Sequence, residues 1–153
     1  MTLQITKHFT LAEMSHSATG ERMGLNNTPP ADLMPNILKV CERLEQIRGH
    51  FGLPVRVLSC YRSPEVNSAV GGSPTSAHRF GLAADIVIEG VANIDLARWC
   101  AEHIADYDQV IYEFGATGWV HIGFTATTTP RKQLLSAAKE SGRTVYHGGI
   151  ERA

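Results

Sequence analysis

The sequence lacks three features that would each point to a particular class of protein. It has no apolar run near the roughly 18 residues of a membrane-spanning helix. Its 14 basic and 15 acidic residues give a formal net charge of -1, so it lacks the basic excess of a sequence-independent nucleic-acid binder. Its N-terminus has neither the basic start nor the apolar core of a secretion signal. We therefore expect no membrane span and no nucleic-acid partner, and a protein that stays in the cytoplasm until it is released.

The cysteines are too few and too scattered for a disulfide framework. Cys41, Cys60 and Cys100 are odd in number, lie far apart and form no C-x-x-C pair, so a thiolate zinc site is not indicated either. Because free cysteine behaves as a small hydrophobic residue, we expect three buried and reduced thiols.

Length and composition favour a single globular domain. The chain has 153 residues, of which 43% are hydrophobic and 19% charged. These values are close to the average for soluble domains, and such a chain can bury about two-thirds of its unfolded surface. We expect one domain over residues 1–153 with its core at about 31–125. The sequence does not specify the oligomeric state, and we take a monomer as the expectation.

Apolar periodicity predicts an α+β fold. Between Ala31 and Phe51 apolar residues recur at intervals of three and four, which is typical of an amphipathic helix, and Gly49 and Gly52 follow as terminators. Alternating β-branched segments predict strands. The other predicted elements are a strand over 53–59, a helix over 64–70 capped by Ser63, a strand over 83–88, a helix over 94–103 capped near Asn93 or Asp95, a hairpin of strands over 109–114 and 118–124, a polar segment after Phe124, and a helix fragment with a tail in the remainder.

The segment SAHRFGLAAD places a histidine seven residues before an aspartate. His78 leaves a loop, Gly81 permits a tight bend, and Asp85 projects from the strand that follows. Imidazole nitrogen and carboxylate oxygen both suit zinc, and three protein ligands with one open position are typical of a catalytic zinc site. The third ligand is expected on a rigid neighbour, and His121 in the strand WVHI is the best candidate. The predicted metal ligands are therefore His78, Asp85 and His121.

Each of these residues also has an ordinary structural interpretation. His78 or His121 alone could be a hydrogen-bonded core histidine, and Asp85 alone could accept hydrogen bonds at a strand end. The three together favour a metal site. The other histidines have no partner at ligand spacing and are interpreted as structural or solvent-exposed: His8, His16, His50, His103 and His147.

The predicted hairpin places a carboxylate beside this site. If residues 114–118 form its loop, Glu113 faces Trp119 and Ile111 faces His121. Glu113 and His121 then share one face of the sheet as diagonal neighbours. In that position Glu113 could accept and relay a proton from a zinc-held water, as metal-assisted hydrolysis requires. A slip of one residue in the register would turn Glu113 to the opposite face, as a solvated surface residue.

Two polar residues upstream are candidates for substrate binding. Arg62 lies at a strand end, where its guanidinium could bind a substrate carboxylate through two hydrogen bonds or stabilise the oxyanion formed at an attacked carbonyl. Its ordinary alternative is a surface salt bridge. Ser76, two residues before His78, could hydrogen-bond behind the metal ligands or simply cap the turn.

These motifs resemble those of peptidase family M15, the zinc D-Ala-D-Ala carboxypeptidases and endopeptidases. The family signature S-x-H-x-x-G-x-A-x-D is matched by SAHRFGLAAD, and the later W-x-H strand by WVH. The segment YRSPEVN is similar to the family's Y-R-S-x-x-x-N, and HFTLAEM and NNTPP resemble the bacteriophage-type branch. The resemblance implies an α+β domain with a small antiparallel sheet and flanking helices, as in the hedgehog/DD-peptidase fold. It also implies zinc bound by His78, Asp85 and His121, and cleavage of peptidoglycan stem peptides.

One position departs from the family pattern. Many relatives place a catalytic acid three residues before the last histidine, where this chain has Gly118. On the hairpin geometry we expect Glu113 to act as the catalytic base instead, with Asp108 as the second choice. Glu113 would take a proton from the attacking water and return it to the leaving amine, while Arg62 polarises the scissile carbonyl or holds a nearby carboxylate.

The leading hypothesis is a zinc-dependent peptidoglycan hydrolase, either a phage or prophage endolysin or a cell-wall carboxypeptidase. The missing secretion signal favours the endolysin, because the resemblance implies lysins that accumulate in the cytoplasm until a holin opens the membrane. One alternative is a zinc-stabilised cell-wall-binding or phage structural module without catalysis, and another is a metal-free domain whose histidines only pack. Carboxypeptidase and endopeptidase activities share the same ligands, so the sequence leaves the cleaved bond open.

Overall fold

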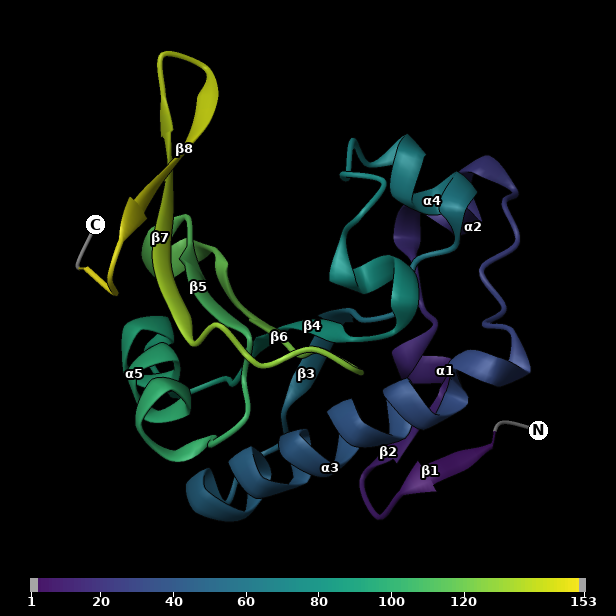
Figure 1. The fold of residues 1–153 in the computed structure, drawn as a ribbon, viewed down its shortest axis with the longest axis horizontal. Coiled ribbons are helices and arrows are strands. Elements are labelled where there is room, and N and C mark those ends of the chain that lie inside the picture. The colour runs from purple at the N-terminus through teal and green to yellow at the C-terminus, as the bar shows by residue number, and fades with distance from the viewer. Residues whose placement is uncertain (1–2, 152–153) are drawn as a thin grey trace.

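The computed structural model describes residues 3–151. They form an α+β fold in which helices pack beneath a six-stranded sheet (Figure 1). On the other side, residues 64–80 and the C-terminal hairpin of the sheet, residues 133–148, rise opposite each other. The α+β class predicted from the sequence is confirmed. Over the same residues, no helix combines the length and the apolar character needed to pass through a bilayer.

The sheet has the strand order β3-β4-β6-β5-β7-β8. Neighbouring strands are antiparallel except for β5 and β7, which are parallel. The sheet is larger than the small antiparallel sheet that we expected, because the C-terminal segment adds two strands and the first of them joins in parallel. The strands are β3 (Arg56–Ser59), β4 (Ala83–Val87), β5 (Gln109–Glu113), β6 (Trp119–Gly123), β7 (Gln133–Glu140) and β8 (Arg143–Gly148).

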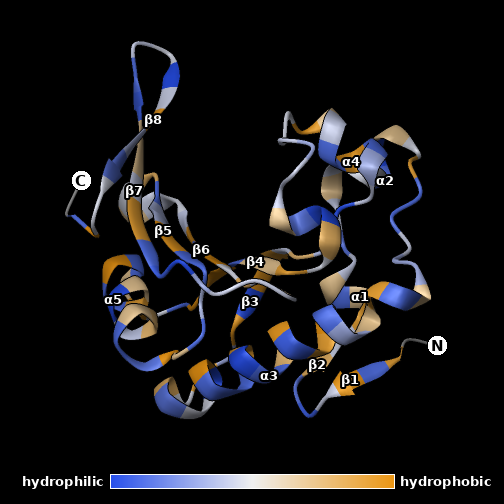
Figure 2. Cartoon of the chain, in the orientation of Figure 1, coloured by the Kyte–Doolittle hydropathy of each residue, from blue (hydrophilic) through white to orange (hydrophobic). Residues whose placement is uncertain are grey.

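Helix α3 (Met34–Phe51) follows the 3-10 turn η1 (Ala31–Leu33), so the predicted helix is present with a tighter first turn. It runs through Gly49 and ends at Gly52, which has a left-handed φ of 65° and is favoured there because glycine adopts this conformation without steric cost. Apolar and polar residues alternate along α3 (Figure 2). Of the apolar residues predicted to face inward, Leu33 lies in η1 and is only partly buried, whereas the others are fully buried: Ile37, Val40, Cys41, Leu44 and Ile47.

Helix α5 (Asn93–His103) lies beneath the other half of the sheet (Figure 1). It begins one residue earlier than predicted, and its N-cap position is Ala92, which offers no side-chain acceptor. Neither Asn93 nor Asp95 therefore caps it. The side chain of Asn93 instead donates hydrogen bonds to the carbonyls of Ala116 and Gly118, which ties the helix to the β5–β6 turn.

The segment before α3 forms short elements at the end of the molecule remote from α5 (Figure 1). A small antiparallel pair is followed by two short helices, each with a side-chain N-cap, from Thr10 and Ser17. Asn27 donates to the carbonyl of Tyr61 and accepts from the amide of Ser63, so this segment also fixes the loop after β3. The elements are β1 (Gln4–Thr6), β2 (Phe9–Thr10), α1 (Leu11–Met14) and α2 (Ala18–Met23).

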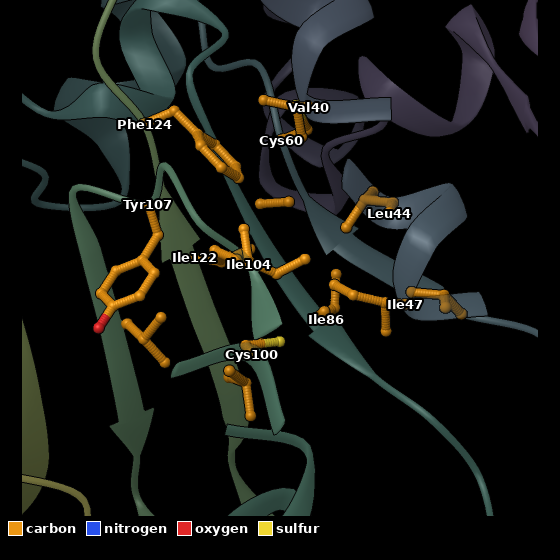
Figure 3. Close-up of a cluster of buried hydrophobic side chains, with 14 of the residues drawn as sticks. Val40, Leu44, Ile47, Cys60, Ile86, Cys100, Ile104, Tyr107, Ile122 and Phe124 are labelled. Carbon is orange, nitrogen blue, oxygen red and sulfur yellow. The ribbon is translucent and has the colours of Figure 1, made fainter. Parts of the chain in front are cut away.

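Alternation along the central strands separates the core from the polar face. Even-numbered residues of β4, β5 and β6 belong to the hydrophobic core beneath the sheet, because successive side chains of a strand point to opposite faces. Figure 3 shows Ile86 and Ile122 of the sheet near Leu44 and Ile47 of α3 and Cys100 of α5. The odd-numbered residues of the same strands point to the other face and supply the candidate site.

The three cysteines lie in or beside this core. Cys41, Cys60 and Cys100 are unpaired and buried, as predicted. Burial raises the pKa of Cys41 and of Cys100 to about 12, so these thiols remain protonated and unreactive at neutral pH.

The C-terminal segment is a β-hairpin, and the predicted helix fragment with a tail is wrong. Strands β7 and β8 pair from Leu135 opposite Gly148 to Glu140 opposite Arg143. Ser141 and Gly142 at the turn both have positive φ, 52° and 77°, as in the two-residue turns that match the twist of a hairpin. The Ser-Gly pair marks this turn in the sequence. Small residues along β7 weaken the alternation that would otherwise predict the strand.

Candidate functional site

Two neighbouring strands and one 3-10 turn bring together the three residues predicted to bind a metal. Asp85 on β4 lies directly opposite His121 on β6, and their side chains share the polar face. His78 comes from η2 (Ala77–Phe80), whose first turn is capped by the Ser76 hydroxyl. Gly81 ends this turn with a φ of 68°, and a Cβ there would lie 2.7 Å from a side-chain carbon of Ile37. Gly81 therefore permits both the bend and the close approach of α3.

The three side chains form a compact buried group. His78 Nε2 lies 3.2 Å and His121 Nδ1 lies 3.0 Å from Asp85 Oδ1, and one ligand atom from each residue lies within 4.8 Å of the others. All three residues are less than a tenth exposed. Within residues 3–151 no other group of three His, Cys, Asp or Glu side chains has this geometry. The remaining histidines thus take no part in it, as expected.

Hydrogen bonds from outside the group orient His78 and Asp85. His78 Nδ1 donates to the carbonyl of Cys60 at 2.7 Å, which leaves Nε2 as the nitrogen that faces Asp85. The other carboxylate oxygen of Asp85, Oδ2, accepts from Arg62 Nη2 at 3.3 Å, which leaves Oδ1 toward the histidines. Metal-binding imidazoles are commonly held in this way, with one ring nitrogen bonded to a carbonyl and the other free for the ion.

The donor set fits zinc. Imidazole nitrogen and carboxylate oxygen are both common ligands of zinc, and three protein ligands leave a fourth position open. Burial alone would raise the pKa of Asp85, but the charge of His78 and the hydrogen bonds from His121 and His78 hold it well below its usual range. Asp85 is therefore ionised, as a metal ligand must be. Gly123 leaves room for the His121 ring, because a Cβ there would lie 3.2 Å from His121 Nε2.

Glu113 lies one strand from this group in the predicted register. Glu113 pairs with Trp119 and Ile111 pairs with His121 across β5 and β6, so Glu113 and His121 share the polar face. Burial, assisted by the negative charge of Asp85, raises the pKa of Glu113 to about 7, which the positive charge of His121 only partly opposes. A carboxyl group with a pKa near the working pH can both accept and return a proton.

Asp108, the second choice for the catalytic base, forms an ion pair with Arg131. Its two oxygens accept hydrogen bonds from Nε and Nη2 of Arg131, the shortest at 2.7 Å, and one also accepts from the Arg131 amide. The hydrogen bonds from Arg131 lower the pKa of Asp108 despite its burial. Asp108 is thus a poor proton acceptor near neutral pH, which favours Glu113.

Gly118 occupies its position because no side chain fits there. It follows the 3-10 turn η3 (Gly115–Thr117) between β5 and β6, and a Cβ built on it would lie 1.7 Å from the carbonyl oxygen of Glu113. An acid at this position would therefore require the whole turn to move. The candidate carboxylate, Glu113, lies on the preceding strand instead.

Restoring the acid at this position is expected to damage the protein. We expect Gly118→Asp to lower the free energy of unfolding by about 1–3 kcal/mol or more, because the new side chain collides with the backbone. We expect no increase in hydrolytic activity over wild type. Urea unfolding measures the change, and Ala116→Asp, at an exposed position of the same turn, is the matched control. A Gly118→Asp protein as stable as the control would show that the turn relaxes easily and would contradict this account.

Arg62 and Ser76 lie beside the metal-binding group with structural partners already in place. Arg62 Nε donates to Ser59 Oγ at 3.0 Å, and its Nη2 donates to Asp85, while Nη1 has no hydrogen bond within residues 3–151. Ser76 accepts from the amide of His78, so it caps the turn. Both residues also line the cleft described next, where a role in substrate binding stays a prediction.

A cleft of about 1040 Å³ lies over the polar face. One wall is the segment that follows α4 (Pro64–Ala69) and continues into η2, and the other is the β7–β8 hairpin (Figure 1). The candidate metal ligands, Arg62 and Glu113 lie along the cleft between these walls. Sequence reasoning missed the hairpin wall, which contributes Leu135, Thr144 and Tyr146.

Comparison with known proteins identifies a family. A protein-family model described as Peptidase M15 matches residues 7–123. The match spans most of the chain, includes every candidate site residue discussed above, and ends at the last residue of β6, before β7 and β8. No curated protein matches the chain.

Proposed function

Because the chain belongs to the peptidase M15 family, we propose that it is a zinc-dependent hydrolase of peptide bonds in peptidoglycan stem peptides. One observation carries the proposal: the buried His78, Asp85 and His121 group faces a large cleft with Glu113 one strand away. The donor set supports zinc as the ion, and the cleft between two raised walls suits a peptide. The stem peptide as substrate is supported by the motifs that the chain shares with cell-wall peptidases.

The ligands would hold zinc through His78 Nε2, an oxygen of Asp85 and His121 Nδ1, the atoms that already converge. When bound, the ion would act as a Lewis acid and lower the pKa of a coordinated water toward about 7. The Cys60 carbonyl and Arg62 keep the ligands in place through their hydrogen bonds to His78 and Asp85. No reorganisation of these side chains is then needed for binding.

The chain's own groups would move the proton and hold the substrate. Ionised Glu113 accepts a proton from the attacking water and returns it to the nitrogen of the leaving amine, so the peptide bond breaks without a free amide anion. Arg62, whose Nη2 contacts Asp85, lines the cleft and would donate from Nη1 to the carbonyl oxygen as negative charge develops on it. Glu113 would therefore transfer the proton on one side of the metal-binding group, and Arg62 would stabilise negative charge on the other side.

Product analysis tests the proposal directly. Purified peptidoglycan incubated with the zinc-loaded protein should release fragments with new free amines, and their masses identify the bond that is cut. Loss of a single terminal D-alanine would indicate carboxypeptidase activity, whereas larger fragments would indicate an endopeptidase. Intact peptidoglycan after incubation with a protein shown to contain zinc would overturn the proposal.

The raised pKa of Glu113 predicts a pH dependence of stability in the metal-free protein. In the unfolded chain this carboxyl group ionises near its ordinary value of 4.5, whereas in the folded chain its pKa is about 7. The folded state therefore binds more protons between these values, and its stability falls as the pH rises through them. Glu113→Gln removes this loss, so the variant should gain stability relative to wild type between pH 5 and pH 8, by at most about 3 kcal/mol.

Urea unfolding with a chelator present, at pH 5 and pH 8, measures this difference. Subtracting the variant from wild type removes the contributions of titratable groups that do not interact with Glu113, so the difference reports Glu113 together with its coupling to Asp85 and His121. The same difference at both pH values would mean that Glu113 ionises normally and would count against it as the proton-transfer group.

The proposal includes a role in lysis by a phage or prophage, with the protein held in the cytoplasm until it is released to the wall. Its support is the likeness of the N-terminal HFTLAEM and NNTPP segments to the bacteriophage-type branch. Expression in a bacterium with and without a co-expressed holin tests it. Lysis that depends on the holin is the expected result, and lysis that is equally absent in both cultures would contradict it.

A further inference from the structure

The β7–β8 hairpin lies outside the family match yet forms one wall of the cleft. The match ends at residue 123, and the hairpin spans 133–148. It pairs in parallel with β5, the strand that carries Glu113, and rises above the sheet opposite α4 and η2 (Figure 1). Strand β7, which lies outside the family match, therefore pairs directly with the strand that carries the candidate catalytic base.

The register places Tyr146 in the same row as Glu113. Glu113 pairs with Ala137 on β7, and Ala137 pairs with Tyr146 on β8. Side chains in one row of a sheet point to the same face, so Tyr146 and Glu113 face the cleft together. The residue between them is alanine, whose methyl group leaves space for the phenol ring to lean over β7. Ala137 itself is only 3% exposed, as expected for a small residue covered by its neighbours.

Tyr146 is exposed and its hydroxyl is available. The residue is 55% exposed, one of the few large apolar side chains at the surface, and it lines the cleft. Its hydroxyl has no hydrogen bond to any residue of the described part of the chain. Partial burial raises the pKa of Tyr146, and the negative charges of Glu113 and Asp85 add to the rise, so the phenol group lies within electrostatic range of the site.

We propose that the β7–β8 hairpin is a substrate-binding wall and that Tyr146 contacts the substrate peptide beside Glu113. The aromatic ring supplies an apolar surface for an extended peptide, and the hydroxyl hydrogen-bonds one of its peptide groups. Leu135 and Thr144 lie on the same face and extend this wall. The inference rests on the proposed function, and it assigns the selection of the peptide to a segment beyond the family-defined core.

Peptide binding by the full chain tests the inference. The probe is the synthetic pentapeptide L-Ala-γ-D-Glu-meso-diaminopimelate-D-Ala-D-Ala, titrated into zinc-loaded protein that carries Glu113→Gln to prevent turnover, with affinity measured from NMR chemical shifts. Adding Tyr146→Ala should raise Kd by about tenfold, as for a contacting tyrosine, and Tyr146→Phe by a few-fold because only the hydroxyl is lost. His147→Ala is the matched control, since His147 is the next residue on β8 and points to the opposite face.

The outcomes separate this inference from the proposed function. A Kd for Tyr146→Ala within twofold of the parent, or no binding by the parent, overturns the inference. A tenfold loss supports it, provided that zinc content and melting temperature match the control, which the exposure of Tyr146 leads us to expect. Hydrolysis of peptidoglycan by the wild-type chain is measured separately, so a chain that binds through Tyr146 but cuts nothing supports the inference and overturns the function.

Discussion

Replacing His78 by alanine is expected to abolish both zinc binding and peptidoglycan cleavage. His78 is 3% exposed and supplies one of three converging ligand atoms, so its loss leaves two protein ligands, too few to hold the ion in a catalytic site. Elemental analysis should find about one zinc per chain in wild type and little in the variant, and turbidity of a peptidoglycan suspension should stop falling. Loss of metal should also lower the melting temperature, because binding to the folded state alone stabilises it.

A surface histidine provides the matched control for this experiment. His16 lies in the N-terminal segment with an exposed side chain near Glu21, and His16→Ala should keep wild-type zinc content and cleavage. If His78→Ala retained zinc, or if metal-replete wild type contained none, His78, Asp85 and His121 would be a hydrogen-bonded core cluster. The packing interpretation of the histidines would then hold.

Replacing Glu113 by glutamine is expected to reduce the rate of hydrolysis by roughly 10²–10⁴-fold while zinc stays bound. Glutamine has nearly the same shape but can neither accept nor return the proton, and Glu113 is not among the converging metal ligands. Steady-state rates with a stem peptide and parallel metal analysis measure the two effects. The separation of activity from metal content distinguishes an enzyme from a zinc-stabilised module that only binds the wall.

Two further variants are compared with Glu113→Gln. Glu102→Gln, on the exposed face of α5, should behave as wild type. Asp108→Asn tests the second candidate for the base: it should weaken the contact with Arg131 and lower stability without a comparable loss of rate. A large loss of rate in Asp108→Asn at unchanged stability, with Glu113→Gln fully active, would exchange the two assignments.

The helices and the register of the site hairpin could be predicted from the sequence because they depend on local physics. The repeat of buried residues in α3 follows from the helical period, and the pairing of Glu113 with Trp119 follows from the positions of the turn and of the alternating strand residues. The hairpin of β7 and β8 could not be predicted in the same way. Apart from Leu134, Leu135, Val145 and Tyr146 its residues are short or polar, so no regular alternation marks both strands, and β7 gains its place by pairing with β5, which is distant in the sequence.

The sequence by itself determined the chemistry of this protein: which side chains are present, and that SAHRFGLAAD and WVH belong to a metallopeptidase pattern. Tertiary structure favours Glu113 over Asp108 as the proposed catalytic base, because burial near Asp85 raises the pKa of Glu113 while Arg131 lowers that of Asp108. It also decided the second wall of the cleft, because only a parallel pairing across the chain brings Tyr146 into the row of Glu113. Residue identity sets the available reactions, whereas pKa values and clefts depend on neighbours that only folding supplies.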